Sequence, residues 1–250
     1  MKSPQLSILI LTEDSAGNAF GALRALIKKM AQLIVPACST HRIEFGPADA
    51  DGRAAMHGHM HAEKGSDGHR RRAILARQIV TQLCRADIDG FVAYHTDGDC
   101  VWSRRADSHR IQQFEKLRAV IQQHLQNPAP RAKLPPDALA RLDRVLLLAS
   151  FYELESWLFQ NTPVAVTICE REYRGRDAEK FREWASNRAH LDEQPNTKDQ
   201  TCLGARHNLE LAERAWPARD VYAANTSFAA SVDHMRNCPA FADALSRTAT

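Results

Sequence analysis

The chain has 250 residues, of which 44% are hydrophobic, enough to bury a real core as one large domain or as one domain with an appendage. Its 33 basic and 30 acidic residues leave a net charge of +3. This balance excludes a strongly basic or acidic protein, so overall charge does not by itself indicate a nucleic-acid binder, although local basic clusters can still do so.

Six cysteines lie far apart and form no C-x-x-C pair. This pattern favours reduced thiols over a disulfide framework or a zinc site. The apolar run at residues 6–11 is too short to cross a bilayer and lacks the layout of a signal peptide. We therefore expect a cytoplasmic protein with no membrane partner.

The first elements predict a strand, an acidic turn and a helix. Residues 6–11 (LSILIL) are typical of a strand covered on both faces, and Glu13 follows in the turn. Apolar residues then recur at steps of three and four, which predicts an amphipathic helix over residues 15–34, ended by Pro36. Glu13 is thereby expected at the carboxyl edge of a sheet.

Residues 40–45 predict a second strand, and residues 46–68, dense in Gly, Asp and His without periodicity, predict a long mobile loop. Within it, His57, His59 and His61 alternate and could chelate zinc, nickel or copper if the segment were extended. Because no cysteine or carboxylate is spaced to complete such a site, a polar loop without metal is favoured.

Four consecutive basic or titratable residues, 69–72, open the next predicted helix, which runs to about Leu83. Positive charge at a helix N-terminus opposes the macrodipole, which slightly favours an anionic partner over a merely solvated helix start. Basic residues also follow the central strand, so a phosphate backbone is one candidate ligand. The candidate nucleic-acid contacts are Arg70, Arg71, Arg72, Arg104 and Arg105.

The most informative stretch is a buried strand at residues 91–94 that stops at Asp97-Gly98-Asp99. Open α/β sheets bind ligands at the carboxyl ends of their strands, and we expect Gly98 to allow a sharp turn that aims both carboxylates at one point. Two close carboxylates repel each other unless a cation or proton lies between them, which indicates a Mg²⁺ or Mn²⁺ site. The alternative is a solvated Asp-Gly turn.

A helix over residues 110–126, a proline-rich linker and a short helix at 137–144 lead to a third predicted strand, 145–149. Glu153 and Glu155 follow it in the first turn of a helix, where negative charge is favoured. For this stretch taken alone, helix capping beside a buried Trp157 is the favoured explanation. However, parallel strands converge at their carboxyl ends, so this third acidic strand end supports a shared site.

From residue 165 onward the chain is charged and helical, with a last helix near Phe228 and a closing segment at 238–241. Lys198 lies in a turn, where it is either solvent-exposed or placed to stabilise a phosphate oxyanion. These patterns predict an α/β, Rossmann-like core with a mostly parallel central sheet over residues 1–162. A smaller helical extension, 163–250, is expected to pack on it.

Three motifs together resemble the TOPRIM domain, the metal-binding α/β module of topoisomerases, primases, OLD-family nucleases and RloB-like proteins. They are residues 9–13 (LILTE), 97–99 (DGD) and 155–159 (ESWLF). The last of these, with residues 227–233 and 237–241, is similar to an uncharacterised bacterial domain family grouped with the OLD and RloB-like proteins. The first turn departs from the usual Glu-Gly, because Asp14 follows Glu13.

The resemblance implies a Mg²⁺-dependent (or Mn²⁺-dependent) nuclease that acts on DNA or RNA. It also implies a partner ATPase from the same operon, an anti-phage role and possible homo-oligomers. In two-metal hydrolysis, Asp97 and Asp99 would hold one ion, and Glu155 with Glu153 the other. Glu13 would bridge the ions or act as general base, and Lys198 or an arginine would neutralise the scissile phosphate.

Two alternatives remain open. The first is a non-catalytic subunit that keeps the TOPRIM-like fold and binds a partner ATPase or nucleic acid. The second is another phosphoryl-transfer enzyme, such as a phosphatase, which is disfavoured because no Asp-x-Asp directly follows the first strand and no glycine-rich phosphate loop is present. The chain also lacks the G-x-x-x-x-G-K-[ST] motif, so any ATP dependence must come from a partner.

Overall fold

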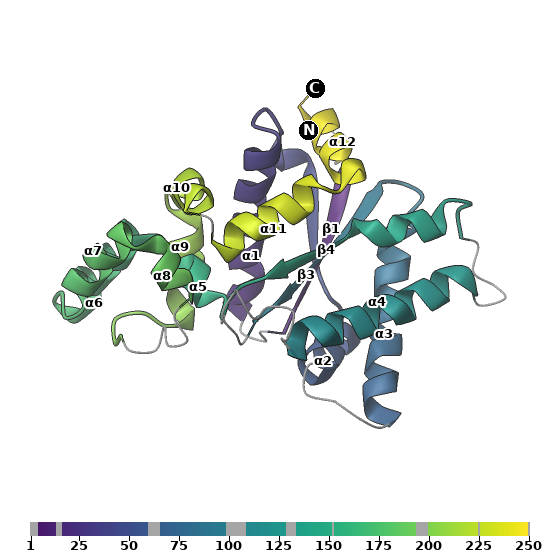
Figure 1. Cartoon of the computed structure of the whole chain (residues 1–250), viewed down its shortest axis with the longest axis horizontal. Helices are drawn as coiled ribbons and strands as arrows, with labels where there is room; N and C mark the ends of the chain where they lie inside the picture. Colours follow the sequence, from purple (N-terminus) through teal and green to yellow (C-terminus); the bar gives the residue numbers. More distant parts are fainter. Residues whose placement is uncertain are drawn as a thin grey trace.

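One parallel sheet lies between two layers of helices, as Figure 1 shows. The computed structural model of the chain describes residues 5–13, 17–59, 66–98, 109–128, 134–151, 153–193, 200–224 and 226–249. In this part of the chain the sheet has four strands in the order β2-β1-β3-β4, all parallel. The strands are β1 (Leu6–Thr12), β2 (Ile43–Pro47), β3 (Asp89–Thr96) and β4 (Val145–Ala149). The predicted α/β class with a parallel sheet is confirmed.

The strand order sets the place where a ligand would bind. From β1 the chain moves outward to β2, then returns so that β3 pairs with the other side of β1, from Leu6 opposite Asp89 to Thr12 opposite His95. The direction of winding therefore reverses between β1 and β3. In open parallel sheets, ligands bind outside the carboxyl ends of the two strands at such a switch point.

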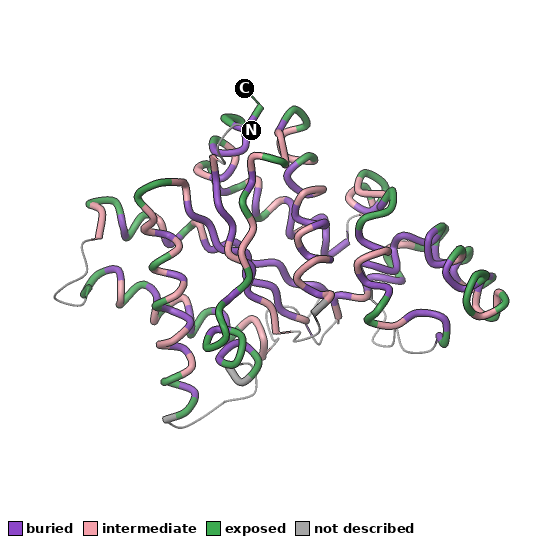
Figure 2. Tube along the Cα trace, turned by 180° about the vertical axis from the view of Figure 1, so that it is seen from behind, coloured by how far each residue is buried: buried purple, intermediate pink, exposed green. Residues whose placement is uncertain are grey.

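Helices cover both faces of the sheet, so β1, β3 and β4 are largely apolar and buried, whereas the edge strand β2 is only partly buried. Along β3, Phe91 and Ala93 belong to one buried cluster, whereas Val92 and Tyr94 belong to the other. Figure 2 shows the strands buried between more exposed helices. This alternation confirms the prediction that the strands are covered on both sides.

Helices from different parts of the chain cover the two faces. On the first face lie α1 (Gly17–Ile34) and α11 (Ser227–Arg236); α11 packs directly on β4. On the second lie α2 (Ala50–His59), α3 (Ser66–Leu83) and α4 (His109–Gln126). The helical C-terminal region that the sequence predicts is present, and its boundary at residue 162 stays a prediction.

The other helical segments are mostly short. They are the 3₁₀ helices η1 (Thr40–Arg42), η3 (Ala138–Arg144) and η4 (Ala205–His207), and the α-helices α5 (Glu155–Leu158), α6 (Thr162–Tyr173), α7 (Ala178–Ser186), α8 (Arg188–Glu193), α9 (Asn208–Glu213), α10 (Ala218–Ala223) and α12 (Pro239–Thr248). The segment expected to be a strand from residue 40 therefore begins as 3₁₀ helix. The segment expected to close the chain at 238–241 opens α12, which Pro239 starts.

The predicted long loop over residues 46–68 is wrong where β2 extends to Pro47, where α2 spans Ala50–His59 and where α3 begins at Ser66. Asp49 starts this helix: its Oδ1 accepts a hydrogen bond from the Gly52 backbone N–H at 2.8 Å, and its carbonyl accepts one from Arg53. Ala55 and Met56 are buried on the second face. The burial of these two apolar side chains thus outweighs the low helix propensity of the glycines in this segment.

Cys169 and Cys202 form a disulfide, so the prediction that all cysteines are reduced is wrong for this pair. The two residues are 33 positions apart. A turn at the end of α6 and the return of residues 200–204 bring them together, which sequence spacing does not reveal. Cys38, Cys84 and Cys238 are free thiols, as expected.

The described helices include none that combines the length and the apolar composition required to cross a membrane.

Candidate functional site

Glu13 links the carboxyl ends of β1 and β3. Its Oε1 accepts a hydrogen bond from the backbone N–H of Asp97 at 2.7 Å and another from the Thr96 hydroxyl at 3.1 Å. The side chain is only 12% exposed. The carboxylate predicted after the first strand therefore lies at the switch point and directly contacts the end of the third strand in the chain.

Arg110, in the first turn of α4, neutralises Glu13. Its Nη1 lies 2.9 Å from Glu13 Oε2, and its side chain is 15% exposed. An ion pair shielded this far from water interacts more strongly than an exposed one. Arg110 was not among the candidate residues, because an arginine in a predicted helix carries no local signal of a partner nearly a hundred positions earlier.

Asp97 connects β3 to the segment that follows β4. Its Oδ1 accepts hydrogen bonds from the Ser150 hydroxyl at 3.2 Å and from the backbone N–H of Leu154 at 3.0 Å. Both donors come from the third acidic strand end of the sequence. The predicted convergence of strand ends is therefore present for Glu13 and Asp97, and it includes the backbone between Glu153 and Glu155.

Gly98 is required here for a reason other than the predicted sharp turn. A Cβ at this position would lie 2.2 Å from the Phe151 carbonyl oxygen and 2.5 Å from that of Ser150. Its φ angle lies outside the left-handed region. The glycine is thus needed for close approach of two backbone segments, which keeps the end of β3 against the end of β4.

Glu153 and Glu155 differ in position. Glu155 opens α5, a helix of four residues, and its Oε1 accepts a hydrogen bond from Asn208 Nδ2 at 3.1 Å. Glu153 precedes the helix, and its backbone carbonyl accepts the Ser156 hydroxyl at 2.8 Å. The prediction that both glutamates lie within a helical first turn is therefore wrong for Glu153.

His95, one residue before the end of β3, is a buried polar group that sequence reasoning missed. Its Nδ1 lies 3.3 Å from the Thr12 hydroxyl, its ring meets Trp157 edge-on at 5.8 Å, and its Nε2 is buried without a hydrogen-bond partner among the described residues. Burial lowers the pKa of His95 to about 3, so the ring is neutral at physiological pH. The signal available was a histidine within an otherwise apolar strand.

The carboxylate oxygens at this edge are of the chemical type that binds a divalent cation, because Mg²⁺ prefers carboxylate oxygen ligands. Among the described residues, however, Glu13, Asp97, Glu153 and Glu155 include no three whose oxygens lie within 4.8 Å of one another. One oxygen of Asp97 already accepts two protein donors, and Arg110 pairs with Glu13. A cation shared with Glu13 would therefore compete with the Arg110 guanidinium. Asp99 lies outside the described residues.

The basic candidates on α3 have different environments. Arg71 donates to Asp67 and to the Ala54 carbonyl, each at 2.8 Å, so it ties α3 to α2. Arg72 is buried and Arg70 is exposed. Because α3 begins at Ser66 with Asp67 in its first turn, the expected conflict with the helix dipole is absent.

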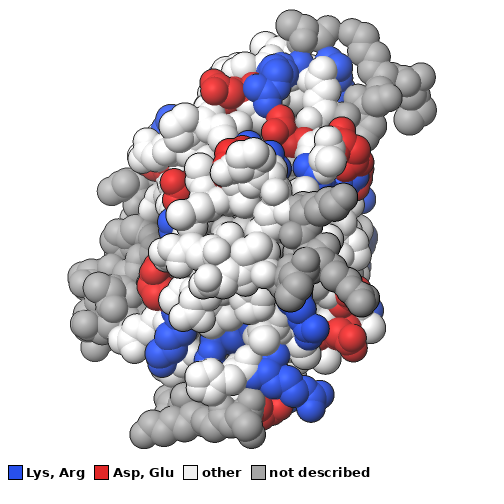
Figure 3. Space-filling model, turned by 90° about the vertical axis from the view of Figure 1, so that its right-hand side faces the viewer, with Lys and Arg blue, Asp and Glu red and all other residues white. Residues whose placement is uncertain are grey.

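Several remaining candidates fall outside the part of the chain that the structure describes: Arg104, Arg105, Lys198 and His61. His57 and His59 belong to α2, so they lie neither in the polar loop that was favoured for them nor in the extended segment that chelation would require. On the face shown in Figure 3, the middle is mostly uncharged, Lys and Arg side chains gather along its lower part, and basic and acidic side chains are intermixed in its upper part.

The fold and the site together define an α/β protein with a doubly covered parallel sheet and with Glu13 and Asp97 at its switch point. Comparisons with protein-family models, curated proteins and solved structures found no match.

Proposed function

We propose that the chain is a TOPRIM-type nuclease that depends on Mg²⁺ or Mn²⁺ and hydrolyses phosphodiester bonds in nucleic acid. One observation carries this proposal: Glu13 and Asp97 directly follow the two strands that flank the switch point, and the 2.7 Å bond from Asp97 N–H to Glu13 Oε1 joins them. Carboxylate oxygens from different strands, oriented by backbone and hydroxyl donors at one edge of the sheet, are the kind of ligand that a divalent cation takes.

The surrounding residues suggest a division of roles. Ser150 and the Leu154 backbone orient one oxygen of Asp97, which keeps its other oxygen in a defined direction. Arg110 forms an ion pair with Glu13, and it would neutralise a scissile phosphate once it leaves Glu13. When bound, the ion would activate a water and stabilise the leaving oxygen.

The same proposal gives roles to further residues and to a partner protein. Asp99, Glu153 and Glu155 would complete the cation site, and Lys198 would assist at the phosphate. We further propose a cytoplasmic effector in anti-phage defence that works with a partner ATPase, since the chain has no G-x-x-x-x-G-K-[ST] motif of its own.

We expect purified wild-type protein to cleave at least one substrate from a panel of DNA and RNA, including tRNA, in the presence of Mn²⁺. Asp97→Ala and Glu13→Ala should each reduce the rate by about 100-fold or more, because each removes a carboxylate of the site. Glu115→Ala, on the exposed side of α4, serves as the matched control and should leave the rate unchanged. Cleavage by both site variants at the wild-type rate would refute the assignment.

A second candidate is a non-catalytic subunit that binds a partner ATPase or nucleic acid. The Glu13–Arg110 ion pair favours it, since a carboxylate already neutralised by arginine does not require a metal for stability. This candidate predicts nucleic-acid or ATPase binding without cleavage on any substrate of the panel. It also predicts that Glu13→Ala leaves that binding intact.

A further inference from the structure

A second group of potential metal ligands lies away from the sheet edge, among the C-terminal helices. Cys169 belongs to α6, Asp177 precedes α7, and Cys202 lies in the segment before η4. One ligand atom from each residue lies within 4.8 Å of the other two, and in the described residues this is the sole such group. Both cysteines are fully buried, and Asp177 is partly exposed.

The backbone at the end of α6 brings Asp177 back to Cys169. Arg174 and Gly175 adopt left-handed conformations, with φ of 57° and 75°, and both N–H groups donate to the Cys169 carbonyl. After this turn, the Asp177 N–H donates to Cys169 Sγ at 3.2 Å. A sulfur that accepts an N–H bond is stabilised as a thiolate, the form that binds metal.

The third segment is fixed to the carboxylate of Asp177. Its Oδ2 accepts hydrogen bonds from the Thr201 N–H at 2.7 Å, the Thr201 hydroxyl at 3.1 Å and the Cys202 N–H at 3.1 Å. Although burial opposes the charge, these bonds from Thr201 and Cys202 hold the pKa of Asp177 below its usual value. The carboxylate is therefore ionised and oriented by the same segment that carries Cys202.

We propose that Cys169, Asp177 and Cys202 form a thiol-gated zinc site. In the disulfide state the two sulfurs are bonded to each other. A dithiol reductant transfers two electrons and two protons to the S–S bond, which yields two thiols and the oxidised reductant. Binding of Zn²⁺ then releases both thiol protons, because zinc binds the thiolate form.

The donor set selects this ion class. Two thiolates favour zinc over Mg²⁺ or Ca²⁺, and one carboxylate oxygen completes three protein ligands. Zinc is commonly four-coordinate, so the partly exposed side at Asp177 leaves the fourth position for water. The hydrogen bonds to Oδ2 provide the outer-shell support that ligating carboxylates normally have.

The test is a zinc titration of protein reduced with dithiothreitol and then freed of reductant without air, using a chromophoric zinc chelator as competitor. Co²⁺ is used in parallel, since thiolate ligation gives a characteristic charge-transfer absorption. The variants are Asp177→Asn and the double substitution Cys169→Ser with Cys202→Ser. Cys84→Ser removes one of the free cysteines and is the matched control.

Reduced wild-type protein and Cys84→Ser should hold a single zinc per chain against the chelator and show the cobalt–thiolate band, whereas the oxidised protein should hold none against the chelator and show no such band. Asp177→Asn should weaken binding by about tenfold or more. The double variant should lose the site while circular dichroism confirms that it remains folded. The proposal would be overturned if reduced wild type bound zinc no more strongly than the double variant, or if Asp177→Asn left zinc affinity unchanged. Either result would mean that the disulfide is purely structural.

Discussion

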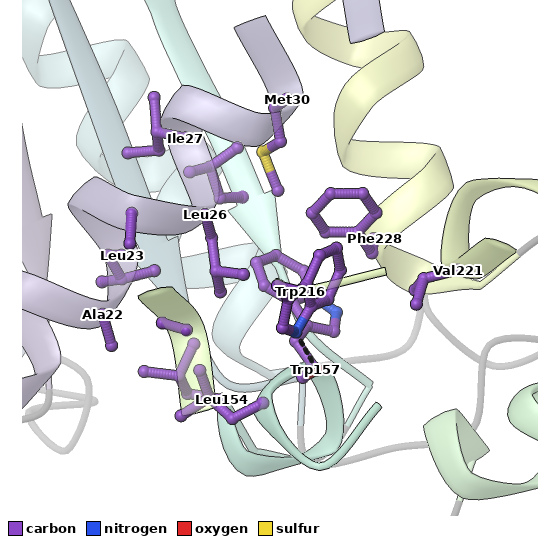
Figure 4. Packing of buried hydrophobic residues seen from close by; sticks show 14 of the residues in the cluster. Ala22, Leu23, Leu26, Ile27, Met30, Leu154, Trp157, Trp216, Val221 and Phe228 are labelled. Carbon is purple, nitrogen blue, oxygen red and sulfur yellow. Dashed lines mark hydrogen bonds between the residues drawn. The ribbon is translucent and has the colours of Figure 1, made fainter. Parts of the chain in front are cut away.

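Trp157→Ala should lower the free energy of unfolding by about 3–5 kcal/mol, the usual cost of truncating a fully buried tryptophan. Trp157 has no exposed surface and lies among Trp216, Phe228 and side chains of α1 (Figure 4). Its Nε1 donates to the Ser227 hydroxyl at 2.7 Å. The substitution removes both the packing and this bond at the point where α5, α11 and the sheet meet.

Urea unfolding followed by circular dichroism measures this loss. Trp157→Phe is the matched variant, because it keeps an aromatic ring but removes the indole donor. It should lower the free energy of unfolding by about 1–2 kcal/mol, which is less than the loss in the alanine variant because most of the packing is retained. A loss below about 1 kcal/mol for the alanine variant would show that the tryptophan does not anchor the C-terminal helices.

Gly98→Ala should destabilise the protein by about 3 kcal/mol, near the upper end of the cost of inserting a methyl group into a packed interior. The atoms that its Cβ would meet, at 2.2 and 2.5 Å, are backbone carbonyl oxygens of Phe151 and Ser150. Unlike a flexible side chain, these oxygens cannot move without separating the ends of β3 and β4. The same movement would break the contacts of Asp97 with Ser150 and Leu154.

Gly46→Ala in β2 is the control, since a Cβ there would meet nothing within 4 Å. It should change stability by less than about 1 kcal/mol. Thermal unfolding of the two variants side by side measures the contrast. Equal stability of the two proteins would mean that β3 and β4 do not approach as closely as described.

The strands and the acidic edge of the sheet were predictable because their signals are local. A run such as residues 91–94 is apolar on both faces, which is the pattern of a buried parallel strand. Once parallel strands are expected, their carboxyl ends must share an edge, and this alone placed Glu13 near Asp97. The prediction required no knowledge of how the helices pack.

The features that were missed depend on contacts between distant residues. Helix α2 is stabilised by Asp49 at its start and by burial of Met56, although its glycines indicate a loop. The Arg110 partner of Glu13 and the partner of Cys169 are set by the tertiary fold. Gly98 was recognised as necessary, but the backbone that it approaches follows a strand more than fifty positions later.

A calorimetric titration of Mn²⁺ into wild type, Asp97→Asn and Arg110→Gln tests most directly whether Glu13 and Asp97 share a divalent ion. The expected result is binding to wild type, affinity about tenfold or more weaker in Asp97→Asn, and tighter binding in Arg110→Gln, where the guanidinium no longer competes for Glu13. The same Mn²⁺ affinity in all three proteins, or no binding to any of them, would contradict it.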